Sequence, residues 1–143
     1  MHLTTYSDYA MRVLMYLGLQ QDKLVTIAQV AERYTISENH LTKVVHFLGQ
    51  QGYIETVRGK GGGLRLKQVP TAINLGQVLS LTEGDEGLLP CVNGASDCCI
   101  LPACRLVSIL RESQAALYQV LGKYTLADLL DNNAPLNKLL STD

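Results

Sequence analysis

Four cysteines gather in one short segment of this 143-residue chain, and the chain has no others. The segment reads Cys91-Val-Asn-Gly-Ala-Ser-Asp-Cys98-Cys99-Ile-Leu-Pro-Ala-Cys104. Grouped thiolates make a soft site that favours iron–sulfur clusters, zinc or copper(I). The segment has no CxxC motif, and no arrangement of His and Asp around a cysteine suggests nucleophilic catalysis. The spacing therefore favours a bound metal centre, and we expect no enzymatic activity.

The start of the chain bears on the compartment in which these thiols work. Residues 1–20 include an apolar stretch, but Asp8 and Arg12 lie within it, which indicates an amphipathic helix rather than a signal peptide. No run approaches the ~20 apolar residues of a membrane span. We therefore expect a cytoplasmic protein without a membrane partner. Structural disulfides are rare in the cytoplasm, which again favours metal or redox chemistry for the cysteines.

The residues before the cysteine segment predict a winged helix-turn-helix. A first helix is expected with Ser7 as its cap, and a second opens with the capping box Thr26-Ile-Ala-Gln29. Ser37 is the expected cap of a third helix, in which apolar residues fall at i, i+3, i+4 and i+7, as one buried face requires. These residues are Leu41, Val44, Val45 and Leu48. Residues 54–68 predict a two-stranded wing around a glycine-rich tip at 59–63.

The face of the third helix opposite its apolar stripe is the expected DNA reader. In this motif the second helix of the pair enters the major groove, and polar side chains can bond base edges or phosphates. Ser37 and the helix N-terminus can hold a phosphate, and a slim basic wing can approach the minor groove. The predicted contacts are Ser37, Asn39, Thr42, Lys43 and His46 from the helix and Arg58, Lys60 and Arg65 from the wing. The alternative is an ordinary solvated helix beside a polar hairpin.

Charge is spread unevenly along the chain. Residues 1–68 hold eight Lys/Arg against five Asp/Glu, a net of +3, whereas residues 69–143 hold four against eight, a net of −4. The basic half is therefore where nucleic acid would bind. Because the surplus is modest, we expect double-stranded DNA to be bound by two subunits acting together.

A long apolar helix is predicted after the cysteines, from Arg105 to Lys123. Burying it against a copy of itself is the economical arrangement, which predicts a symmetric homodimer and a palindromic operator. A helical tail broken at Asn132-Asn133 and Pro135 should follow. The expected fold class is mainly α with a small β-hairpin: a winged helix-turn-helix domain at 1–81, a linker and cysteine loop at 82–104, and a dimerisation helix with its tail at 105–143.

Four stretches of the chain resemble the winged-helix iron–sulfur regulators, and the resemblance runs over essentially the whole chain. The Arg-Gly-x-Gly-Gly-Gly wing is typical of that family, and the three-cysteine loop of its cluster-binding members. The resemblance implies a transcriptional repressor with one iron–sulfur cluster per subunit, either 2Fe–2S or 4Fe–4S. The stretches are Thr5-Tyr6-Ser7-Asp8-Tyr9-Ala10, Val57-Arg58-Gly59-Lys60-Gly61-Gly62-Gly63, Pro102-Ala103-Cys104-Arg105-Leu106 and Tyr124-Thr125-Leu126-Ala127-Asp128-Leu129.

The resemblance also implies the cluster ligands, which would be Cys91, Cys98 and Cys104. Six residues separate the first two, where family members usually have four or five, and Cys99 competes with Cys98 for one position. We favour Cys98 and treat Cys99 as a bystander. Val107 stands where some members carry a ligating histidine, so that type of ligation is not expected. In the nitric-oxide-sensing members, an aspartate from the partner subunit fills the fourth position. Asp8 occupies the matching motif, although an acid there could simply stabilise the helix start.

A cross-subunit ligand suggests how a signal reaches DNA. Nitric oxide reacting with the cluster would break the bond between subunits, release the spacing of the two recognition helices, and free the operators of nitric-oxide detoxification genes. One alternative is a redox- or iron-responsive regulator that uses the same cluster. Another is a zinc site, with three thiolates and a carboxylate or histidine at ~2.0–2.3 Å. Metal-free thiol oxidation is a third.

Overall fold

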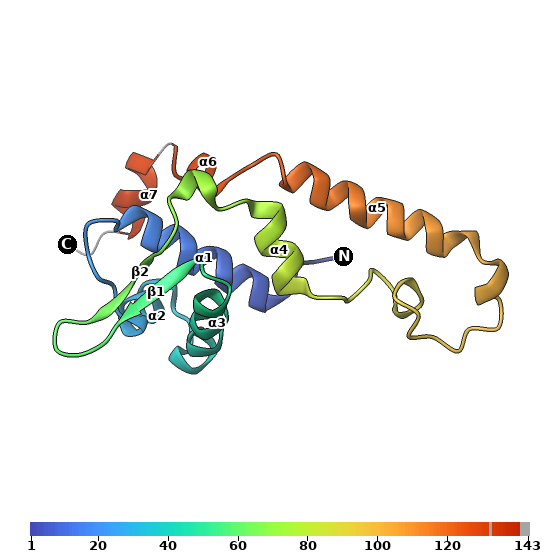
Figure 1. Ribbon diagram of the computed structural model, residues 1–143, viewed down its shortest axis with the longest axis horizontal. Helices are drawn as coiled ribbons and strands as arrows, with labels where there is room; N and C mark the ends of the chain where they lie inside the picture. The colour runs from blue at the N-terminus through green and yellow to red at the C-terminus, as the bar shows by residue number, and fades with distance from the viewer. Residues whose placement is uncertain (132, 141–143) are drawn as a thin grey trace.

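The computed structural model describes residues 1–131 and 133–140. Figure 1 shows an elongated molecule, in which a mainly helical head, formed by residues 1–83 and the described residues after Leu121, carries a long arm. Along the chain the elements are α1 (Thr5–Leu19), α2 (Ile27–Tyr34), α3 (Glu38–Gln50), β1 (Ile54–Val57), β2 (Gly63–Leu66), α4 (Leu75–Glu83), α5 (Arg105–Leu121), α6 (Leu126–Leu130) and α7 (Asn133–Leu140). Short 3-10 turns lie at Pro70–Ala72, Pro90–Val92 and Leu101–Ala103. The expected fold class, mainly α with a small β-hairpin, is confirmed.

Helix α1 is the centre of the head. It packs on α3, α4, α6 and β2, and its buried face runs from Ala10 to Gly18. Its start differs from the expected one: Thr4 is the N-cap, and its side chain accepts a hydrogen bond from the Ser7 backbone N–H. Ser7 itself is fully buried inside the first turn. An N-cap side chain accepts a hydrogen bond from the backbone N–H two or three residues after it, and Thr4, with its extended backbone, holds that position before α1.

The helix-turn-helix and wing follow the pattern that the sequence predicts. Thr26 and Gln29 form a reciprocal capping box at the start of α2. The turn to α3 passes through Thr35 in a left-handed conformation, with φ 55° and ψ 48°. β1 and β2 pair antiparallel, with Ile54 opposite Leu66 and Val57 opposite Gly63. A bridge from Val25 to Leu64 ties the tip-side half of β2 to the segment before α2, so the wing is fixed beside the helix pair.

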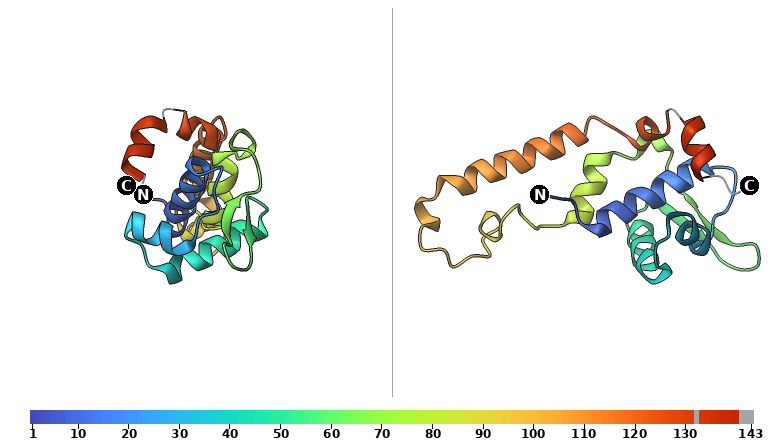
Figure 2. Two further views of the ribbon diagram at one scale, coloured as in Figure 1. Left: turned by 90° about the vertical axis from the view of Figure 1, so that its left-hand side faces the viewer. Right: turned by 180° about the vertical axis from the view of Figure 1, so that it is seen from behind.

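The arm consists of α5 and the segment 84–104. These two run side by side away from the head, as the front and back views agree (Figures 1 and 2). The turn Pro90–Val92 packs on α5, and the C-terminal half of α5 returns to α4. Seen end-on in Figure 2, the arm projects from behind the head. At 1.5 Å per residue, the 17 residues of α5 extend about 25 Å.

Two boundaries in the acidic half differ from expectation. Glu83 was expected in a polar linker, but it is the last residue of α4 and bonds to the start of α1. The tail was expected to break at Asn132-Asn133 and Pro135, but Asn133 opens α7 and Pro135 lies in its first turn. Proline is tolerated there because the N–H groups of a first turn have no helical partner. Asn132 lies outside the described residues. No helix in the described part of the chain is long and apolar enough to cross a membrane.

Candidate DNA interface and cysteine centre

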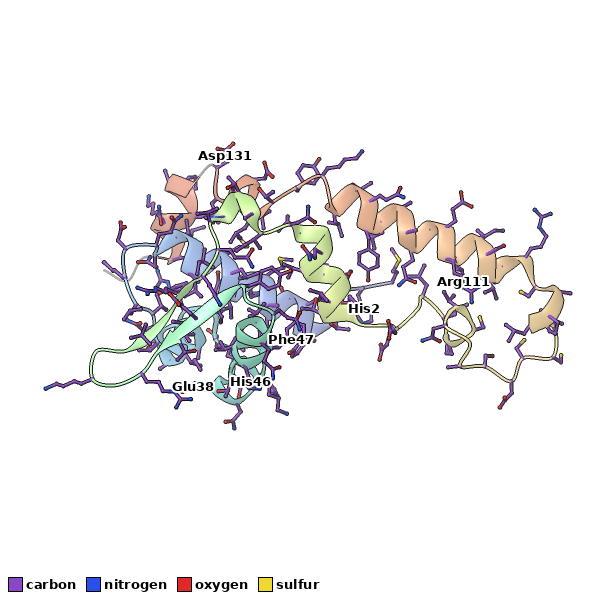
Figure 3. The ribbon with its side chains drawn as sticks, viewed as in Figure 1. His2, Glu38, His46, Phe47, Arg111 and Asp131 are labelled. Atoms are coloured by element: carbon purple, nitrogen blue, oxygen red, sulfur yellow. The ribbon has the colours of Figure 1, made fainter. Side chains whose placement is uncertain are left out.

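The predicted recognition face lies on α3. Leu41, Val44 and Leu48 are fully buried, and Val45 is nearly so, which confirms the apolar stripe. The opposite face carries the four side chains predicted to contact base edges or phosphates, all exposed: Asn39, Thr42, Lys43 and His46. In Figure 3, Glu38 and His46 lie on the side of α3 that faces away from the rest of the head. Burial of one stripe thus leaves the polar row directed to solvent, as a groove-reading helix needs.

The start of α3 suits an anion. Ser37 is the N-cap and is exposed, and its side chain makes no capping hydrogen bond. The N–H groups of the first turn have no helical acceptor, and the helix dipole favours negative charge there. A backbone phosphate could therefore bond these groups. Thr42 is less available, because its hydroxyl donates to the Glu38 carbonyl over 2.8 Å.

The wing carries its basic residues beyond the head. Arg58 and Lys60 are exposed beside the tip, where Gly59 and Gly61 have positive φ values of 101° and 75°. Such backbone angles are costly for residues with a Cβ, which explains the glycines. Arg65 is also exposed, but its Nε lies 2.6 Å from Glu55 Oε1 on the paired strand. An exposed ion pair contributes little, about 0–1 kcal/mol, so Arg65 can exchange Glu55 for a phosphate at small cost.

Two tyrosines of α1 fix the position of α3, and sequence reasoning missed both. The Tyr6 hydroxyl lies 3.4 Å from the Lys43 carbonyl, and its ring meets Phe47 edge-on at 5.7 Å between centroids. Tyr9 lies 6.3 Å from the His40 ring. Their spacing of three residues on an amphipathic helix was the available signal, because it places them on one face. These contacts join the first turns of α1 to α3.

A polar joint ties α1 to the end of α4, where the cysteine segment begins. Glu83 Oε1 accepts hydrogen bonds from the Thr4 N–H at 2.8 Å, the Thr4 hydroxyl at 2.9 Å and the Ser7 hydroxyl. Ser7 also lies 2.6 Å from the Thr82 hydroxyl. Burial by itself would raise the pKa of Glu83, but the bonds from Ser7 and Thr4 outweigh it and leave this pKa below its ordinary value. The joint therefore holds an ionised carboxylate.

The cysteine loop lies at the far end of the molecule from the wing (Figure 1). All four cysteines are free thiols; Cys91 and Cys104 are half-buried, and Cys98 and Cys99 are exposed. Within the described residues, no three Cys, His, Asp or Glu side chains approach closely enough to hold a metal ion. The donor set suits a cluster, with several thiols in one loop, but a single chain in this conformation does not bring them together.

Asp8 lies in the head, on the exposed side of the first turn of α1. Both of its carboxylate oxygens are 3.0 Å from Arg12 Nε, and both side chains are more than 40% exposed. Arg12 also lies 5.4 Å from the centre of the Tyr34 ring. Asp8 belongs to α1 and the cysteines to the segment after α4, and no group of three metal-binding side chains among the described residues includes Asp8.

Comparison with known proteins gives the family. Residues 3–132 match the Rrf2 model, described as an iron-dependent transcriptional regulator. The HTH-type transcriptional regulator NsrR of Shouchella clausii is 50% identical over 142 residues, which cover 98% of this chain and 95% of that protein. NsrR of Bacillus subtilis is 46% identical, with 98% and 97% covered.

Solved structures show the same fold. IscR of T. potens superposes with a TM-score of 0.73 at 23% identity, over 95% of this chain and 90% of that one. CymR, the global cysteine regulator of B. subtilis, gives 0.69 at 22%, over 92% and 98%. The family match spans nearly the whole chain, with its helix-turn-helix, wing, arm and cysteine loop. This chain therefore belongs to the Rrf2 family of transcriptional regulators.

Proposed function

We propose that this protein is a homodimeric transcriptional repressor that binds a palindromic operator and senses nitric oxide through an iron–sulfur cluster. The observation that carries the proposal is that one chain combines two features. Helix α3 has a buried apolar face and an exposed polar face, and one loop contains all four cysteines as free thiols. The similarity to the NsrR regulators over almost the full chain supports the same function. A role on DNA also supports a cytoplasmic location.

The DNA contacts divide by chemistry. Lys43, Arg58 and Lys60 are exposed cations that neutralise phosphates, and each released counterion makes binding more salt-dependent. Asn39 and His46 are exposed on α3 and can bond base edges in the major groove. Arg65 joins them once it leaves Glu55. With a net of +3 in residues 1–68, one head has little electrostatic affinity, so a pair of heads is needed.

Dimerisation through α5 is supported by how little of that helix its own chain covers. Only Val107 of its 17 residues is buried. Leu106, Ile109 and Val120 are 50%, 52% and 51% exposed, and Tyr124 just beyond is 50% exposed. Leu106, Ile109 and Val120 lie on one side of α5 at helical spacing and form an apolar stripe, and Tyr124 lies in the connection that follows the helix. Exposed apolar stripes of this length mark protein interfaces, and the same stripe on a second copy is its natural partner.

Four residues would hold the cluster: Cys91, Cys98 and Cys104 of one subunit and Asp8 of the other. When bound, an iron–sulfur cluster supplies iron that reacts with nitric oxide. Asp8 can leave Arg12 at little cost, because the pair is exposed and an exposed pair contributes about 0–1 kcal/mol. A carboxylate is also a weaker ligand for this soft centre than a thiolate, which suits a bond made to be broken.

The same contacts describe how the signal reaches DNA. Asp8 follows directly after Ser7, which the Glu83 joint holds, and it lies between Tyr6 and Tyr9, which contact α3. A bond from Asp8 to the partner's loop therefore fixes where α1 and α3 of one subunit lie relative to the other subunit. Loss of that bond frees the spacing of the two recognition helices. A coupling of ~1–3 kcal/mol would give about 5- to 150-fold weaker operator binding.

Anaerobic purification tests the proposal. The absorption spectrum and the iron and sulfide content would identify the cluster, and a nitric oxide titration would follow binding to a promoter fragment. We expect a brown protein that bleaches and releases DNA together. A colourless protein with bound zinc, or DNA binding that ignores bleaching, would contradict the sensor function and leave the DNA-binding head intact.

A second candidate signal is iron supply. The family is described as iron-dependent, which favours a regulator whose DNA binding follows cluster occupancy rather than nitric oxide alone. Removal of the cluster with a chelator, without nitric oxide, separates the two. If the chelator and nitric oxide release DNA at the same fraction of chains with an intact cluster, then cluster occupancy itself controls DNA binding.

A further inference from the structure

The cysteine loop is built in two unlike halves. In residues 85–95, hydrogen bonds connect Asn93 Nδ2 to the Asp85 carbonyl at 2.8 Å and the Ala95 N–H to the Pro90 carbonyl at 2.9 Å. In residues 96–103, the bonds among the described residues run within the segment or to Cys104, such as the Leu101 N–H to the Cys98 carbonyl at 3.0 Å. Among the described residues, the first half alone also accepts side-chain hydrogen bonds from α5.

Two side chains of α5 donate hydrogen bonds to residues 85–95. Arg111 Nε donates to the Val92 carbonyl over 2.8 Å, and Gln114 Nε2 donates to the Glu86 carbonyl over 3.3 Å. Figure 3 shows Arg111 between α5 and the loop beneath it. Val92 is buried, and a Cβ added to Gly87 would come within 2.6 Å of the Val92 Cβ, so the chain closes tightly on this residue. The turn Pro90–Val92 is therefore fixed in the single chain.

Cys91 is the middle residue of that fixed turn. Its thiol is half-buried, whereas Cys98 and Cys99, in the half that α5 does not hold, are exposed. A ligand whose backbone is already fixed loses less conformational entropy on binding than a ligand in an unheld loop. Groups that orient a metal ligand through such bonds typically change metal affinity 10–100-fold when they are removed.

We propose that Arg111 is a positioning residue that presets Cys91 as the first cluster ligand, around which the Cys98–Cys99 stretch then closes. This role rests on the proposed cluster. The donor is a specific atom: Nε lies partway along the side chain, and a lysine carries its only donors at the end. A conservative Arg111→Lys change therefore keeps the charge and loses the bond.

Hydrogen exchange on cluster-free protein tests whether the Arg111 bond stabilises the turn Pro90–Val92 when no cluster is bound. Arg111→Met keeps an apolar stem and removes the donor, and Lys123→Met, an exposed cation just beyond the end of α5, is the matched control. We expect amides of residues 92–95 to exchange about 2- to 13-fold faster in R111M, the factor that one hydrogen bond's typical contribution implies. Residues 98–103 and the K123M protein should exchange as the wild type does.

Cluster retention tests the consequence. After identical reconstitution, iron and sulfide per chain and the rate of iron loss to a chelator are measured for wild type, R111M, R111K and K123M. We expect at least about tenfold faster loss from R111M and R111K and no change in K123M. Wild-type rates in R111M, or full rescue by R111K, would overturn the role of the Nε bond. A wild-type chain that takes up no iron or sulfide would instead overturn the cluster, and this role with it.

Discussion

The head and the arm of this protein bury their apolar residues in opposite ways. In the head, α1 and α3 place Ala10, Val13, Leu14, Leu41 and Val44 completely out of solvent. In the arm, α5 buries a single residue, Val107, and leaves an apolar stripe in solvent. The apolar residues of the head are therefore covered within one chain, whereas the arm leaves apolar surface on which we propose that a second chain packs.

The largest expected effect separates two adjacent thiols of the arm. Cys98→Ala should abolish the cluster and the operator binding that depends on it, because one of three thiolate ligands is lost. Cys99→Ala, the neighbouring control, should retain both. The measurements are iron and sulfide content and DNA binding. If the cluster survives in Cys98→Ala and is lost in Cys99→Ala, then Cys99 is the ligand and Cys98 is not.

Breaking the interface of the arm comes next. Ile109→Asp places a charge in the middle of the stripe, and burying an unpaired charge at an interface is strongly unfavourable. We expect a monomer by analytical ultracentrifugation and operator binding weaker by about 10²–10⁴-fold, since two linked heads gain that much over one. Glu112→Gln, a change at an exposed position on the same helix, should leave the dimer intact. A dimeric Ile109→Asp protein would move the interface elsewhere.

Substituting one leucine in the head and one in the arm tests whether the two regions differ in how their apolar residues are buried. Leu41→Ala should lower the free energy of unfolding by about 2–5 kcal/mol, because Leu41 is fully buried in the head. Leu106→Ala removes the same atoms from a half-exposed position on α5, so its effect should depend on protein concentration. Chemical denaturation at several concentrations measures both. Equal and concentration-independent losses would show that the arm is folded by its own chain.

A smaller effect is expected on the DNA-reading face. Lys43→Met should weaken binding uniformly across operator sequences, by about tenfold at low salt, and reduce the salt slope by about one. The control is Gln50→Met, which changes an exposed side chain at the end of the same helix. Fluorescence anisotropy at several salt concentrations gives both quantities. A sequence-dependent loss would make Lys43 a base contact rather than a phosphate contact.

The smallest effect concerns the polar joint between the start of α1 and the end of α4. Because the pKa of Glu83 is lower in the folded chain than its ordinary 4.5, its ionised form favours folding. That stability is present in full above pH 4.5 and is lost as pH falls through the lower folded value. Glu83→Gln should therefore unfold more easily than wild type at pH 7, and the gap should close in acid. Denaturation midpoints across pH measure it, with Glu112→Gln as control, and a constant gap would show that ionisation plays no part.

Much of the head could be predicted from the sequence because its signals are local. The capping box at Thr26 and the stripe from Leu41 to Leu48 depend on neighbours within one or two turns, and both stand in the structure. Ser7 shows the limit of such signals. Thr4, Thr5 and Ser7 all carry hydroxyls near the helix start, and the Ser7 hydroxyl is buried against Glu83, which lies 76 residues away along the chain.

The cysteines show what local signals leave open. Their types and their confinement to 14 residues determined the soft chemistry of the site, since thiolates bind such centres in any loop. Tertiary structure decided the rest: Cys91 is fixed through Arg111 on α5, Cys98 is not, and Asp8 lies in the head. The physical reason is the distance along the chain between the residues that determine each feature. Helix caps and apolar stripes are set by bonds within a few residues, whereas the positions of ligands depend on packing between segments that meet only after the chain has folded.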